Sequence, residues 1–197
     1  RHGMRLMIAQ AQLSAEGSLA GLGSVAERLP KDIVISDYYT AEFYGGWEKD
    51  FPRLQKLDLD FFVQPWIDSH GHIMPYVGHA MDFSDLEISR GLQFGAVGST
   101  TCDWGDDVHY HLPAVTWFPF VYHAASAWTG AKLDRDYFNR AYCRLFFGTS
   151  DDSIARAILL VGNINGQKLK LRNAAGGIDE PAYTGNSTFG RYYYEFF

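Results

Sequence analysis

Three short segments of this chain place aromatic side chains next to carboxylates. They are Asp37-Tyr38-Tyr39, Pro65-Trp66-Ile67-Asp68 and Cys102-Asp103-Trp104-Gly105-Asp106. An aromatic ring stacks on the C–H face of a pyranose, and carboxylates accept hydrogen bonds from its hydroxyls. The segments therefore predict a carbohydrate-binding site, with Tyr38, Trp66, Asp68, Trp104 and Asp106 as candidate residues. The alternative is structural, with the tryptophans in a core and the aspartates capping helices.

The segment Asp68-Ser69-His70-Gly71-His72 suggests a different chemistry. Asp-x-His-x-His at a strand end resembles the first metal-binding motif of amidohydrolases, in which two histidines bind a divalent ion, and His109 and His111 repeat the His-x-His spacing. That motif stands on the first of eight strands, and the chain after His72 is too short for seven more units of about 31 residues. Histidines in a polar loop are therefore the preferred interpretation, and no metal is predicted.

Each of the three segments ends an apolar run that is typical of a buried strand. The runs are residues 4–9, 33–38, 61–66 and 94–102, of which the last three lead into the segments above. They begin about 30 residues apart, which is the length of one βα unit in a parallel barrel. Functional side chains of such barrels lie at the carboxyl ends of the strands, so the candidate residues are expected in one cleft.

Helix signals separate and follow the runs. The sequence predicts helices at residues 18–29, from a capping box at Ser84 and Glu87 onward, from Pro113 to about residue 128, at 134–147, and at 154–161 with Ser150 as the cap. From Gly162 onward, Gly, Asn and Pro interrupt the apolar residues and indicate a linker or an irregular tail.

Composition restricts the partners. The net charge is −6 and the basic residues do not cluster, which argues against nucleic acid. No apolar run reaches the roughly 20 residues that a membrane-spanning helix needs. Two cysteines do not form a disulfide framework, and the compartment stays unknown.

Two stretches of the chain resemble a known family. Residues 29–39, with Ile33-Val34-Ile35-Ser36-Asp37, and residues 95–106, which end in Trp104-Gly105-Asp106, are similar to the later barrel strands of family 20 glycoside hydrolases, which include the β-N-acetylhexosaminidases. The helix between Trp117 and Trp128 is similar to the last barrel helix of that family. The resemblance covers roughly residues 3–148, and Trp104-Gly105-Asp106 is its most specific part.

The resemblance implies an α/β fold, the second half of a (β/α)₈ TIM barrel. About four βα units would fill residues 1–130, and a helical extension with an irregular tail would fill residues 131–197. The family removes N-acetylhexosamine from glycans by a substrate-assisted retaining mechanism that needs no cofactor. Its catalytic Asp-Glu pair stands after the fourth strand, and no matching segment occurs in this chain. The catalytic pair is therefore expected upstream, in a missing first half of the barrel that would be this chain's partner.

The matching positions imply particular roles. Trp104 would form a wall of the sugar pocket, and Asp106 would bind outer hydroxyls, although the family usually has Glu there. Trp66 and Asp68 stand where the family places Asp and Tyr against the acetamido group, without a clean match. A non-catalytic carbohydrate-binding barrel remains an alternative. The isolated chain is expected to be inactive, with open strand edges at residues 4–9 and 94–102.

Overall fold

The structure is a computed structural model that describes residues 5–10, 27–38, 47–67, 69, 74–103, 111–163, 168–169 and 182–183. These residues form a four-stranded parallel sheet, five α-helices and a short antiparallel strand pair. The chain divides into two compact units. Unit 1 comprises Arg1–Trp66, Phe83–Cys102 and Ala125–Lys132, and unit 2 comprises Ile67–Asp82, Asp103–Ala124 and Leu133–Phe197. The expected domain division at residue 130 stays a prediction.

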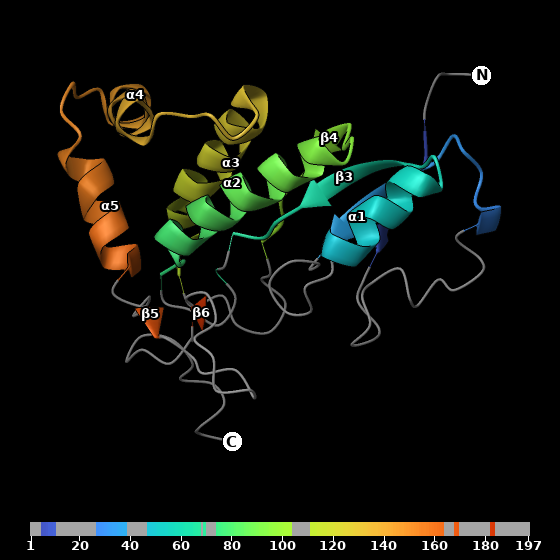
Figure 1. Ribbon diagram of the computed structural model, residues 1–197. Coiled ribbons are helices and arrows are strands. Elements are labelled where there is room, and N and C mark those ends of the chain that lie inside the picture. The colour runs from blue at the N-terminus through green and yellow to red at the C-terminus, as the bar shows by residue number, and fades with distance from the viewer. Residues whose placement is uncertain are drawn as a thin grey trace. The chain divides into compact units, whose positions relative to one another are not determined.

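The sheet belongs to unit 1 and confirms the parallel strands that the spacing predicts (Figure 1). It contains β1 (Met7–Gln10), β2 (Val34–Tyr38), β3 (Asp60–Gln64) and β4 (Gly98–Ser99), in the spatial order β1-β2-β3-β4 with every pair parallel. An α/β fold with a parallel sheet is therefore established. The two outer strands are β1 and β4, as expected from the sequence.

The fourth strand begins later than the apolar run that predicts it. Helix α2 (Val77–Gln93) extends to the start of that run, and the chain then turns at Gly95, whose φ is +86°. The Ala96 N–H donates to the Gly91 carbonyl over 2.8 Å, which closes the helix end. Phe94 therefore lies in the turn after a helix and not in a strand. An apolar run alone does not distinguish a helix end from a strand start.

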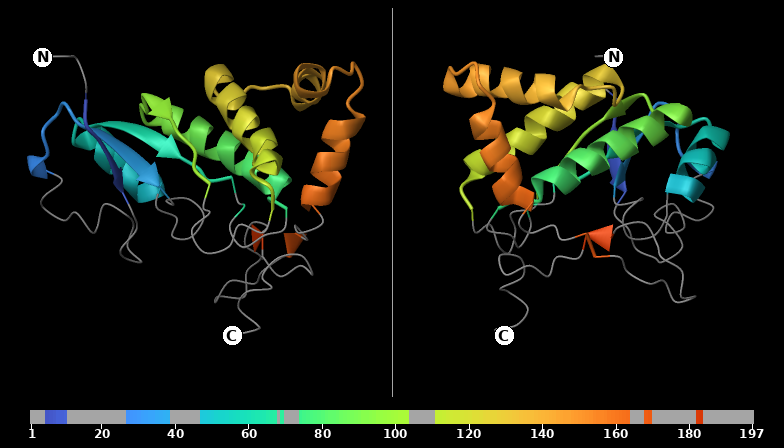
Figure 2. Two further views of the ribbon diagram at one scale, coloured as in Figure 1. Left: turned by 180° about the vertical axis from the view of Figure 1, so that it is seen from behind. Right: turned by 60° about the vertical axis from the view of Figure 1, so that its left-hand side comes forward.

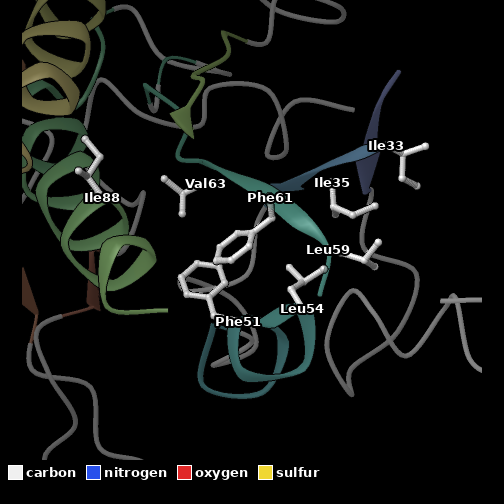
Figure 3. Packing of buried hydrophobic residues seen from close by; sticks show 8 residues of the cluster. All are labelled: Ile33, Ile35, Phe51, Leu54, Leu59, Phe61, Val63 and Ile88. Atoms are coloured by element: carbon white, nitrogen blue, oxygen red, sulfur yellow. The ribbon is translucent and has the colours of Figure 1, made fainter. Parts of the chain in front are cut away.

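The main core of unit 1 lies between one face of the sheet and the helices α1 (Trp47–Lys56) and α2 (Figure 3). Phe51 of α1 packs on Phe61 of β3 with ring centroids 5.1 Å apart, and Val63 and Ile88 extend the cluster. Phe51, Phe61 and Val63 are each at most 1 % exposed. Burying such side chains stabilises a fold by about 1.5–3 kcal/mol each, so this cluster holds the helices to the sheet.

The sequence analysis missed α1 and misplaced the start of α2. Helix α1 carries Pro52 in its interior and many charged residues, so its apolar stripe is reduced to Phe51 and Leu54, both fully buried. Helix α2 begins seven residues before Ser84, which is buried within it, so the predicted capping box is wrong. The helix predicted at 18–29 lies mostly outside the described residues. Its last three positions, 27–29, are described and form a short turn.

In unit 2 the start of α2 is capped by a side chain from another helix. The Asn163 carboxamide oxygen accepts from the Gly78 N–H over 2.9 Å. A Cβ on Gly162 would lie 2.9 Å from the Pro75 carbonyl oxygen, so glycine allows the end of α5 to approach this turn. A tertiary contact therefore replaces the local cap that the sequence pattern suggested.

The remaining helices follow the predictions closely. Helix α3 (Trp117–Thr129) is preceded by a 3₁₀ turn at Pro113–Thr116, and α4 (Arg135–Phe147) begins after Asp134, which accepts from the Tyr137 N–H. Helix α5 (Ser153–Asn163) follows α4 (Figure 2). Ser150 does not cap it. Instead the Asp151 carboxylate accepts from the Ser153 N–H over 2.6 Å.

Aromatic rings join α3 and α4 within unit 2. Phe118 lies 5.2 Å from Phe138 and 4.7 Å from Tyr142, both edge to face, and Tyr122 packs on Phe138 in the same way at 5.0 Å. The Ala155 N–H of α5 donates to Cys143 Sγ of α4 over 3.3 Å. In the tail, β5 (Lys168–Leu169) and β6 (Ala182–Tyr183) pair antiparallel.

Candidate functional site

The strand register places two of the predicted sugar-binding residues on one face of the sheet. Tyr38 of β2 pairs with Gln64 of β3, and Trp66, two residues further along, forms an isolated bridge with Cys102. Side chains alternate between the two faces of a sheet along each strand. The odd-numbered Phe61 and Val63 pack against α1 and α2, so these even-numbered residues lie on the opposite face. We call this the even face. It belongs to unit 1.

The even face is buried along β2, where Val34, Ser36 and Tyr38 are each at most 6 % exposed, and is less buried than the opposite face only from β3 onward. Along β3, Asp60, Phe62 and Gln64 are half-buried, whereas Phe61 and Val63 are buried. Trp66, Thr100 and Cys102 are also half-buried. The half-buried part of this face, from β3 to the segment after β4, combines polar groups with aromatic rings.

Three polar side chains from three neighbouring strands or their ends are linked on the even face. The Ser36 hydroxyl of β2 donates to Gln64 Oε1 of β3, and it lies 3.5 Å from Thr100 Oγ1 at the end of β4. Ser36 is 2 % exposed, so its hydrogen bonds are made away from bulk water. Hydroxyls and a carboxamide both donate and accept hydrogen bonds, and they can recognise the hydroxyls of a sugar.

Glycine at position 98 shapes the same face. A Cβ there would lie within 2.7 Å of ring carbons of Phe62, which is closer than two carbons can approach. The Phe62 ring therefore lies directly over the backbone of β4. Tyr38 of β2, Phe62 of β3 and Trp66, two residues beyond the end of β3, give the even face three aromatic side chains.

Asp37 does not belong to the even face. It neighbours Tyr38 in the sequence, but its register partner is Val63, which packs in the core, and its side chain is fully buried. Asp37 therefore does not accompany Tyr38 on the even face, because neighbouring strand residues point to opposite faces.

In unit 2 the segments that follow β3 and β4 are joined by a hydrogen bond. The Ser69 hydroxyl donates to Asp103 Oδ1, and Ser69 is 1 % exposed. The predicted residues Asp68, Trp104 and Asp106 lie outside the described residues, and their positions stay predictions. His70, His72 and His109, on which the metal alternative depends, also lie outside them.

The described residues meet neither the requirements of a metal site nor those of a membrane-spanning helix. Within the described ranges, no group of three His, Cys, Asp or Glu side chains is arranged to hold a metal ion. No helix in this part of the chain is long and apolar enough to cross a membrane.

Sequence reasoning missed Ser36, Gln64 and Thr100, although a signal was present. Each is a polar residue within or at the end of an otherwise apolar run, at a position that alternates with the core residues. Polar residues at such positions indicate a face that is not a simple core.

No protein-family model matches this chain, and no curated protein or solved structure matches it either.

Proposed function

We propose that the chain is the carbohydrate-binding half of a glycoside hydrolase barrel of the β-N-acetylhexosaminidase type. The observation that carries the proposal is the even face, where the buried Tyr38 and the half-buried Trp66 lie near the carboxyl ends of β2 and β3, beside the linked side chains of Ser36, Gln64 and Thr100. Aromatic rings bind the apolar side of a pyranose, and the polar groups bind its hydroxyls. The particular sugar, N-acetylhexosamine, rests on the resemblance to family 20.

The strand order supports a barrel segment. Four parallel strands follow one another in space as they do in sequence, and Phe51 of α1 and Ile88 of α2 pack in one cluster with the same face of the sheet. A doubly wound sheet reverses its strand order and carries helices on both faces, whereas a (β/α)₈ barrel does neither. The even face corresponds to the interior of such a barrel.

The proposed reaction divides the work between this chain and the rest of the barrel. The 2-acetamido oxygen of the sugar attacks the anomeric carbon, while an acid protonates the leaving oxygen. The adjacent Asp-Glu pair of this chain, Asp179-Glu180, does not follow a predicted strand. We therefore assign binding to this chain and acid catalysis to the missing first half of the barrel.

A binding experiment tests the sugar site. N-acetylglucosamine is titrated into the chain and its saturation-transfer NMR signal is measured for the parent, for Trp66→Ala and for Trp66→Phe. Loss of one stacking ring weakens binding by about three- to tenfold, and phenylalanine restores most of it. Trp128→Ala is the matched control, since Trp128 is 92 % exposed on α3 and should not change the affinity.

Two outcomes would contradict the proposal. One is equal weakening by Trp66→Ala and Trp128→Ala, which would remove Trp66 from the site. The other is clear turnover of a chromogenic N-acetylhexosaminide by this chain alone, which would show that the catalytic acid lies within it.

A further inference from the structure

The outer side of α4 in unit 2 forms a hollow that is independent of the sugar site. It has a volume of about 390 Å³ and is lined by Tyr137, Arg140, Ala141, Arg144, Leu145 and Ser150. Binding sites for small molecules have volumes of roughly 300–1,000 Å³. The hollow is therefore large enough for one ring-sized ligand.

The lining residues form a second stripe along α4. Five of them run from Tyr137 to Leu145, the last four standing three, four, seven and eight positions after the first, so they share one side of the helix. The inner side carries Phe138 and Tyr142, which pack against Phe118. Because the inner side already holds α4 in place, the outer stripe is not needed for that packing.

Two arginines give this stripe its charge. Arg140 and Arg144 lie one helical turn apart, both are exposed, and neither forms a hydrogen bond or an ion pair through its side chain with the described residues. By contrast, Arg135 at the start of the helix pairs with Asp82 at 2.7 Å. Two neighbouring guanidinium groups can bind one carboxylate, sulfate or phosphate with several charge-assisted hydrogen bonds.

The stripe also offers apolar surface beside the charge. Leu145 is 80 % exposed and Tyr137 is 63 % exposed, and both line the hollow. A ligand that combines an anionic group with a ring would cover this surface and neutralise the arginines. The hydroxyl of Ser150, from the loop after α4, adds a hydrogen-bonding group to the rim.

We infer that the hollow along α4 binds an organic anion, in which a carboxylate, sulfate or phosphate group is attached to an apolar ring. The anionic group contacts Arg140 and Arg144, and the ring lies against Tyr137 and Leu145. This site does not depend on the proposed sugar site.

The test uses benzoate, phenyl sulfate and phenyl phosphate as probes. Benzyl alcohol, which has the ring without the charge, and inorganic phosphate, which has the charge without the ring, are the controls. Binding is followed by the backbone amide NMR signals of Tyr137 and Ser150 in the full chain. At least one aromatic anion is expected to give saturable shifts, with benzyl alcohol and inorganic phosphate each at least about threefold weaker. The preferred anionic group identifies the class of the natural ligand.

Charge-removing variants locate the site. Arg140→Gln and Arg144→Gln are each expected to raise the Kd about threefold or more, and the double variant about tenfold, because exposed charge pairs contribute modestly. Arg90→Gln on α2 removes the same charge outside the hollow and should leave the Kd within about twofold. Melting temperatures check that all variants fold.

Three results would overturn the inference. They are the absence of saturable shifts with all three aromatic anions, equal binding of phenyl phosphate and inorganic phosphate, and an equal effect of Arg90→Gln and the α4 variants.

Discussion

Replacing Gly91 by alanine is expected to destabilise the chain, although alanine favours helices. Gly91 lies near the end of α2, where α2 approaches β3. A Cβ at this position would overlap Val63 Cγ1 and would lie 3.0 Å from Ala96 Cβ. Val63 is 1 % exposed and β-branched, so its methyl group cannot rotate away easily.

The magnitude follows from two opposing effects. In a helix interior, alanine is more favourable than glycine by about 1 kcal/mol. Overpacking a close-packed core costs about 1–3 kcal/mol. Because the overlap involves a stiff side chain in the centre of the main core, the cost exceeds the gain. We expect Gly91→Ala to lower the free energy of unfolding by about 1 kcal/mol.

A double-mutant cycle isolates this contact. Val63→Ala alone costs about 2 kcal/mol through lost apolar burial, and it removes the methyl group that the new Cβ would meet. In the Val63→Ala background only the close contact with Ala96 Cβ at 3.0 Å remains, so Gly91→Ala should change from destabilising to neutral or stabilising by up to about 0.5 kcal/mol. The free energies are measured by urea unfolding monitored by circular dichroism. If Gly91→Ala stabilises the parent chain, or if the two substitutions are additive, the close approach of α2 and β3 is wrong.

Two further predictions concern unit 2. Asp134→Ala should lower the free energy of unfolding by about 1 kcal/mol because it removes the cap of α4. Asp134→Asn retains a hydrogen-bond acceptor and should change this free energy little. Equal effects of the two substitutions in urea unfolding would show that the cap contributes nothing. Burial, with a smaller contribution from the neighbouring Cys143, raises the pKa of Tyr142 above its ordinary value of 10.0. The stabilisation from keeping Tyr142 protonated is therefore full below pH 10.0 and is lost as the pH rises through the folded pKa. Urea unfolding at about pH 8 and pH 10.5 should show a smaller loss for Tyr142→Phe than for the parent, and an identical loss would exclude this linkage.

The strands were predictable because parallel strands have a local signature. Residues 33–38 and 61–66 are continuous apolar runs, which is typical of strands whose two faces are both covered. Their spacing matches the length of one βα unit. Helix α4 was equally predictable, since Asp134 and the stripe of Phe138 and Tyr142 stand within one short segment. These features depend only on neighbours in the sequence.

The starts of β4 and α2 were not predictable in the same way. The apolar Phe94 suits a strand as well as the turn after a helix, and only the turn at Gly95 decides between the two. The start of α2 depends on Asn163, 85 positions further along, which accepts from the Gly78 N–H. A capping box at Ser84 is a valid local pattern, yet a distant side chain satisfies the backbone at a different position.

The sequence by itself determined the class of fold, the four parallel strands and the aromatic and polar character of the segments that follow them. Only the tertiary structure decided which of those side chains share a face. Tyr38, Gln64 and Trp66 share the even face, while Asp37 turns into the core beside Val63. The physical reason is that residue type sets the chemistry a side chain can perform, whereas strand register and alternation set which side chains meet.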